Sequence, residues 1–278
     1  MNNKNDCLIA LFIISNLTSV PCYAANISEQ QLADQLKELY TSKKYSEDQI
    51  RPYGLSGEKK RIVQKYMDWL VRQPEFTLRA AKLLLQVGGN DLKNFQSYDE
   101  GYVAGQKIGI ALLTDLSAKG LTKLNTRDLR TYYKYQLRAL DIYTPQYCKK
   151  LTFGPRDSTF ANETIQMNRR FYAHLSIPEV REFVAISQRS MKAALDDSIS
   201  QKIIQPAERD IATMAWQNAM IKECKKLPAN ECNKFIQAAS EPDKATDAEL
   251  CNVAKLTMRA MYNLDDLLFS IVAIDSLK

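Results

Sequence analysis

The chain has 278 residues, a formal net charge of +6 and 45% hydrophobic residues. This apolar content is enough for a folded core and excludes wholesale disorder, while only 9 Gly and 9 Pro argue against a loop-rich or β-rich fold. A net charge of +6 is modest for a protein that binds nucleic acid, so nucleic acid is not an expected partner.

The N-terminal segment predicts a secretory signal peptide covering residues 1–24. Lys4 is followed by an apolar run over residues 7–17 and then by small residues up to Ala24, an order that is typical of signal peptides. Cleavage after Ala24 leaves a mature chain of residues 25–278, which we expect to be periplasmic or secreted. A lipoprotein anchored at Cys22 and an uncleaved anchor are the alternatives. No later segment is apolar for the roughly 20 residues that a membrane-spanning helix needs.

Four of the six cysteines lie in the expected mature chain. An even number of cysteines in an exported protein favours two disulfides over a metal site, and the long spacings and the single His make zinc a weak alternative. Cys224 and Cys232 fall at facing ends of two expected helices joined by a short turn, so we expect them to form one bridge. Cys148 then pairs with Cys251 and closes a long loop.

Helix start and stop signals recur along the mature chain and predict an all-α fold, either a multi-helix bundle or an irregular helical array. Capping boxes are expected at Ser28, Ser97 and Ser176, and glycines such as Gly120 are expected to end helices. The expected helices cover about residues 28–42, 46–51, 56–73, 75–87, 98–119, 125–143, 161–174, 178–199, 206–227, 230–239 and 247–276.

The segment 144–159 is the longest expected loop, because Pro145, Gly154 and Pro155 interrupt it. We expect a single helical domain over residues 25–278, with a possible sub-domain division at this loop. Glycines at positions 101, 105 and 109 share one helix face and predict close approach of a neighbouring helix.

Catalytic motifs are weak in this sequence, and no cofactor or metal ligand set is expected. The only histidine, His174, lies at the end of an expected helix, where a cation is favourable in any case. Ser56 and Lys59 match the S-x-x-K motif of penicillin-binding proteins, but its companion motifs are missing. Glu100 and Glu163 are candidate acids for a lysozyme-like mechanism, which remains the alternative function.

The expected helix over 125–143 carries the most suggestive surface. Its apolar face is built by Leu129, Tyr133, Leu137 and Leu140. Opposite this face, cations recur at spacings of three and four and form one stripe bordered by a tyrosine. The candidate binding residues are Arg127, Arg130, Lys134, Tyr135 and Arg138.

Arginine and tyrosine are common anchors of protein interfaces, so the stripe favours a binding role. The sequence therefore predicts a non-catalytic exported helical protein that binds another macromolecule, as an inhibitor, a toxin-immunity protein or an envelope assembly factor does. The expected partner is a protein or an acidic envelope component. The alternative is a cell-envelope hydrolase with lysozyme-like acid catalysis.

Overall fold

The computed structural model describes residues 28–41, 50–91, 109, 112–154 and 160–277. These residues form helices joined by turns and no β-strand, which confirms the all-α class. Their contacts divide into two compact units, one drawn from residues 28–117 and 172–197 and the other from residues 118–171 and 198–277. Each unit is described separately below, and a single domain over residues 25–278 stays a prediction. None of the helices in the described part of the chain is both long and apolar enough to cross a bilayer.

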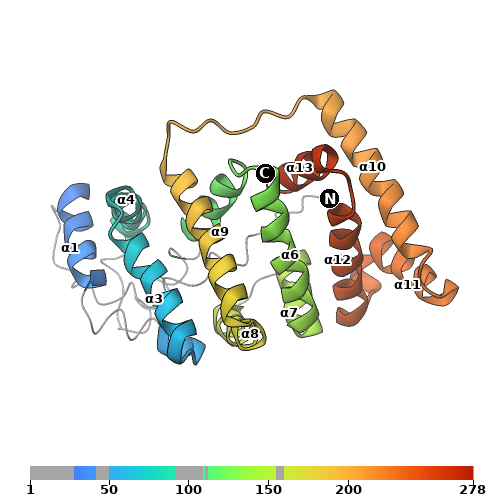
Figure 1. The fold of residues 1–278 in the computed structure, drawn as a ribbon, viewed down its shortest axis with the longest axis horizontal. Coiled ribbons are helices and arrows are strands. Elements are labelled where there is room, and N and C mark those ends of the chain that lie inside the picture. Colours follow the sequence, from blue (N-terminus) through green and yellow to red (C-terminus); the bar gives the residue numbers. More distant parts are fainter. Residues whose placement is uncertain (1–27, 42–49, 92–108, 110–111, 155–159, 278) are drawn as a thin grey trace. The chain divides into compact units, whose positions relative to one another are not determined.

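In the unit that begins at residue 28, α1 packs against α3 and α4, and α3 packs against α9 (Figure 1). Leu36, Leu70, Phe76 and Val180 have 0% of their surface exposed and mark its core. The helices of this unit are α1 (Glu29–Thr41), η3 (Arg51–Tyr53), α3 (Gly57–Val71), α4 (Pro74–Asp91), helical residues 112–117 and α9 (Ile177–Leu195).

In the other unit, α12 is central, because it packs against α6, α7, α10, α11 and α13 (Figure 1). Leu129, Tyr135 and Phe269 are fully buried there. The helices of this unit are α6 (Thr126–Ile142), α7 (Pro145–Phe153), α8 (Phe160–His174) as far as residue 171, α10 (Pro206–Cys224), α11 (Ala229–Ser240), η4 (Pro242–Lys244), α12 (Asp247–Tyr262) and α13 (Asp266–Asp275).

Both predicted disulfides are present in this second unit. Cys148 of α7 is bonded to Cys251 of α12, with their Cα atoms 5.3 Å apart, and we call this bond the long-range disulfide. Cys224 of α10 is bonded to Cys232 of α11, with Cα atoms 5.1 Å apart, and we call it the hairpin disulfide. The predicted pairing is therefore confirmed, and the two bonds tie α12 to α7 and α10 to α11.

The capping boxes that the sequence predicts at Ser28 and Ser176 are present at the starts of α1 and α9. Gln31 N donates to Ser28 Oγ at 3.2 Å, and Ser28 N donates to Gln31 Oε1 at 3.0 Å, which completes the capping box of α1. Ser176 N donates to Glu179 Oε2 at 2.7 Å in the box that begins α9. These local bonds explain why the helix starts were predictable from sequence.

The expected loop over 144–159 is wrong for residues 145–153, which form α7. Pro145 occupies the first turn of this helix, where its missing N–H costs nothing and its fixed φ angle is helical. Thr144 Oγ1 caps the helix by accepting from Tyr147 N at 3.3 Å. The proline therefore begins a helix here and does not break one, and α7 can present Cys148 to α12.

The long final helix expected over 247–276 is also wrong, because the chain forms two helices there. α12 ends at Tyr262 and α13 begins at Asp266. Asp265 Oδ1 accepts from Leu268 N at 3.0 Å, so Asp265 is the N-cap of α13. The apolar spacing continues across the break and therefore hides it in the sequence.

One glycine signal did not end its helix as expected, because α4 continues through Gly88 and Gly89 to Asp91. The helix over 112–121 ends one residue after Gly120, close to the expected position. Glycine only lowers helix stability by about 1 kcal/mol relative to alanine, so tertiary packing can override it. Residues 46–49 of the short helix expected over 46–51, the box at Ser97 and the glycines at 101 and 105 lie outside the described residues.

Candidate functional site

Helix α6 carries the residues that the sequence singled out for binding. Its first turn is fixed by Asn125, whose Oδ1 accepts from Asp128 N at 2.9 Å. Leu129, Tyr133 and Leu140 are buried as expected, and Tyr133 Oη donates to the carbonyl oxygen of Ala273 at 3.2 Å. The apolar face of α6 thus packs within its unit, against α12 and α13.

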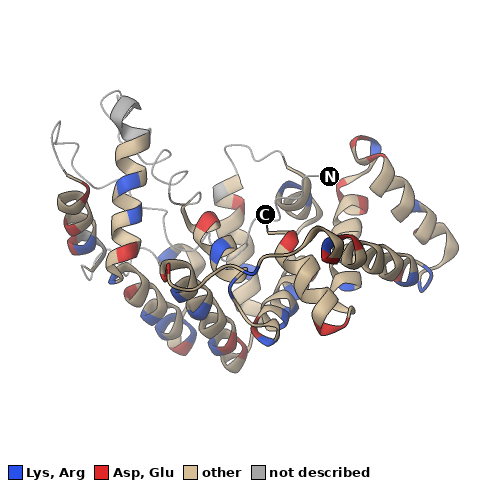
Figure 2. Cartoon of the chain, turned by 90° about the horizontal axis from the view of Figure 1, so that it is seen from above, with Lys and Arg blue, Asp and Glu red and all other residues tan. Residues whose placement is uncertain are grey.

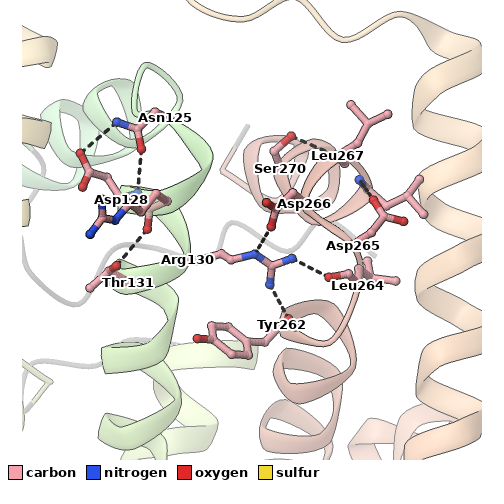
Figure 3. Close-up of polar contacts among 12 residues, drawn as sticks. Asn125, Asp128, Arg130, Thr131, Tyr262, Leu264, Asp265, Asp266, Leu267 and Ser270 are labelled. Atoms are coloured by element: carbon pink, nitrogen blue, oxygen red, sulfur yellow. Dashed lines mark hydrogen bonds and ion pairs between the residues drawn. The ribbon is translucent and has the colours of Figure 1, made fainter.

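Arg130 uses its guanidinium within the protein. As Figure 3 shows, it reaches from α6 to the turn between α12 and α13. Its Nη atoms donate to the carbonyl oxygens of Tyr262 and Leu264 at 2.7 and 2.6 Å, and its Nε donates to Asp266 Oδ1 at 2.6 Å. The guanidinium carbon also lies 4.4 Å from the centre of the Phe269 ring. These contacts satisfy carbonyls at the end of α12 that have no helical donor, so Arg130 holds the α12–α13 corner against α6.

The other members of the predicted stripe differ in exposure. Arg127 and Lys134 are exposed, and Arg138 is half-buried. Tyr135 has 0% of its surface exposed, so its ring belongs to the core and does not lie on the surface beside the stripe. Lys134 Nζ lies 4.8 Å from the centre of the Tyr135 ring. Whether these residues bind a partner stays a prediction.

Helix α12 brings two further cations to this surface. Asp141, near the end of α6, accepts from Arg259 at 3.3 Å and lies 3.5 Å from Lys255 Nζ. Lys255 and Arg259 are one helical turn apart on α12, so a single carboxylate holds both of them beside α6. We call this surface the basic face. Its cations are Arg127, Lys134, Arg138, Lys255 and Arg259.

The charge of the basic face is local. Figure 2 shows Lys and Arg interspersed with Asp and Glu over the helices, and the whole chain has a net charge of only +6. The basic face as defined contains five cations and one acid, Asp141, so its formal charge is +4, and only Lys255 and Arg259 lie against that acid. Guanidinium groups offer planar pairs of donors that fit carboxylates and phosphates. The face is therefore suited to an acidic ligand group.

Sequence reasoning missed the contribution of α12. The only signal was the spacing of Lys255 and Arg259, four residues apart in a predicted helix. That spacing places them on one side of α12, but it does not say that α12 lies beside α6. The contact depends on tertiary packing and on Asp141, which reads in the sequence as an ordinary helix-end acid.

The candidate catalytic groups have structural partners. Glu163 Oε1 accepts from Lys150 Nζ at 2.7 Å, so this acid forms an ion pair between α7 and α8, and Glu100 lies outside the described residues. Lys59 Nζ donates to the carbonyl oxygen of Tyr172 at 2.9 Å and so caps the end of α8. His174 occupies the last turn of α8, as expected. A lysozyme-like activity stays an untested alternative.

A group of buried tyrosines lies in the unit that begins at residue 28. Burial raises the pKa of Tyr66 and the pKa of Tyr172, and for Tyr172 the neighbouring Tyr66 and Tyr53 raise it further. Their hydroxyls therefore remain protonated at physiological pH.

Within the described part of the chain, no cluster of three or more His, Cys, Asp or Glu side chains could hold a metal ion.

Comparison with known proteins found no match to the chain among protein-family models, curated proteins or solved structures.

Proposed function

We propose that the mature chain is an exported helical binding protein that recognises an acidic macromolecule, preferably a protein, through the basic face. One observation carries the proposal: Asp141 holds Lys255 and Arg259 beside α6, the helix that carries the exposed cations Arg127 and Lys134. This arrangement concentrates charge in one place on a chain whose charge is otherwise mixed. Such local fields attract ligands of opposite sign and orient them.

Export is part of the same proposal. The two disulfides are compatible with an oxidising, extracytoplasmic compartment. The expected signal peptide over residues 1–24 lies outside the described residues, so its cleavage near Ala24 stays a prediction. Mass spectrometry of the protein from its native host would test it, because cleavage leaves an N-terminus at residue 25.

The binding test compares two variants with the same net charge. Arg127→Glu with Lys134→Glu changes the basic face, while Arg72→Glu with Lys82→Glu changes two exposed cations, one at the C-cap of α3 and one on α4. Each replacement alters the charge by two units, so both variants fall from +6 to +2. Only the first removes charge from the basic face.

Poly-L-glutamate serves as the defined acidic probe, with binding measured at several salt concentrations. We expect the basic-face variant to bind at least about tenfold more weakly than the wild type, and the control to lose about threefold or less. Equal losses in the two variants would show that only net charge matters. Proteins captured from the envelope fraction of the host would then be ranked by how much more weakly they bind the basic-face variant than the control variant.

A further inference from the structure

A row of apolar side chains lies exposed along α10. Ile211, Met214 and Ile221 have 57%, 57% and 52% of their surface exposed. With the exposed Asn218 they follow spacings of three, four and three, which place all four on one face of the helix. We call these four residues the α10 row. In Figure 2, α10 is tan along its middle with charged residues at its ends.

The opposite side of α10 packs within its own unit. Trp216 Nε1 donates to the carbonyl oxygen of Thr257 in α12 at 3.0 Å. Arg209 Nε donates to Asp275 in α13 at 2.8 Å. These contacts hold the helix so that the row points away from α12 and α13. Exposed apolar side chains that line up on one rigid helix commonly mark an interaction surface.

The order of residues in the row reads nearly the same in both directions about position 216. In an antiparallel pair of identical helices, Ile211 of one copy faces Ile221 of the other, and Met214 faces Asn218. The charges at the ends of α10 fit the same arrangement. Exposed Asp210 lies near its start, and exposed Lys222 and Lys225 lie at or beyond its end. An antiparallel pair therefore brings the acidic end of one row to the basic end of the other.

We propose that the α10 row is a homodimer interface in which two copies pair antiparallel about a two-fold axis beside position 216. A two-fold interface must be complementary to itself, and both the apolar spacing and the charge order of α10 meet this condition. A parallel pair would instead bring like charges together at both ends. The proposal is independent of the basic face and adds a self-association site to the proposed binding role.

The test measures the mass of the oxidised mature protein by sedimentation velocity over a range of concentrations. A single helix pair buries less surface than a standard stable interface, so we expect a dimer with a Kd on the order of 10–100 µM. Met214→Asp should weaken the dimer by at least about tenfold, because each substitution occurs twice in the interface. Leu78→Asp, which changes an exposed apolar residue of α4, is the control and should leave the Kd unchanged.

Charge exchange tests the orientation. Asp210→Lys alone and Lys222→Asp alone should each weaken the dimer, because these two positions face each other in this register, and the two together should restore it to within about threefold of wild type. Far-UV circular dichroism of each variant reports retained folding. A wild-type chain that remains monomeric at several hundred micromolar, or a Met214→Asp variant that dimerises like wild type, overturns the proposal. If lipid vesicles or an unrelated protein bind to the α10 row and the chain does not dimerise, the proposal is overturned too.

Discussion

Replacing Arg130 by methionine should destabilise the fold far more than the same change at Arg127. Methionine keeps an apolar stem against Phe269, but it removes the donors to the carbonyl oxygens of Tyr262 and Leu264. The two carbonyls lie where α12 ends and have no helical donor of their own. The α12–α13 corner therefore loses its main polar link to α6.

The expected loss can be estimated from the contacts. Arg130 retains 23% side-chain exposure, so each charged hydrogen bond to a carbonyl is given about 1 kcal/mol, below the value for a fully buried one. The ion pair with Asp266, whose side chain is 79% exposed, adds about 0.5 kcal/mol. The ring contact with Phe269 adds about 0.5 kcal/mol. Arg130→Met should therefore lower the free energy of unfolding by about 3 kcal/mol.

The assay is urea unfolding of the oxidised protein over residues 25–278, followed by circular dichroism at 222 nm. Arg127→Met is the matched control, because Arg127 is exposed on the same helix and should change stability by no more than about 0.5 kcal/mol. Arg130→Lys should fall between wild type and Arg130→Met, since one ammonium group cannot reproduce the planar set of donors. If both methionine variants unfold like wild type, the Arg130 contacts do not stabilise the corner.

Three further predictions concern stability. Removing the long-range disulfide, which spans 103 residues, should cost on the order of 4–5 kcal/mol, and removing the hairpin disulfide, which spans 8, about 2 kcal/mol less, because the chain-entropy term grows with loop length; equal losses in urea unfolding would contradict this order. The hydrogen bond from Lys226 lowers the pKa of Glu223, so its contribution to stability is present above its unfolded pKa of about 4.3 and is lost as the pH falls through the lower folded value. The Tm difference between wild type and Glu223→Gln should therefore shrink between pH 7 and pH 3, and a constant difference would refute the assignment. Tyr147→Phe removes a buried bond of 2.9 Å to Thr164 Oγ1 and should cost about 1 kcal/mol in urea unfolding; a stability equal to that of wild type would show that this bond contributes nothing.

Helix positions were predictable where the signal is local. Ser28, Asn125 and Ser176 begin helices through bonds to residues three positions away, and such spacings are visible in the sequence. The disulfide pairing followed from the same logic, because two helix ends joined by a short turn must lie close together. The prediction at Pro145 failed, because we expected the proline to interrupt a loop and it begins α7. Proline breaks a helix in its interior but is favourable in its first turn, so the residue type alone does not decide between the two.

Tertiary contacts were not predictable in the same way. Helical periodicity placed Arg130 and Lys134 on one stripe, but it could not say that the corner after α12 supplies carbonyls to only one of them. Tyr135 was assigned to the surface although its side chain is fully buried. A helix that packs against several neighbours has a wide buried sector, so residues at the edge of a predicted polar face can belong to either side.

These contacts decide how binding by α6 must be tested. Reversing Arg130 and Lys134 together would remove surface charge and the brace of the α12–α13 corner at once, so lost binding would not distinguish a damaged surface from a damaged fold. Reversing Arg127 and Lys134 avoids this problem, because both are exposed on α6 and the Arg130 contacts stay intact. In the opposite experiment, Arg130→Met should keep its affinity for an acidic probe per folded molecule, since the basic face remains. If the first variant loses binding without losing stability and the second loses stability without losing binding, α6 carries two separable roles. If the two losses always occur together, the binding measured is a consequence of folding and the basic face has no independent function.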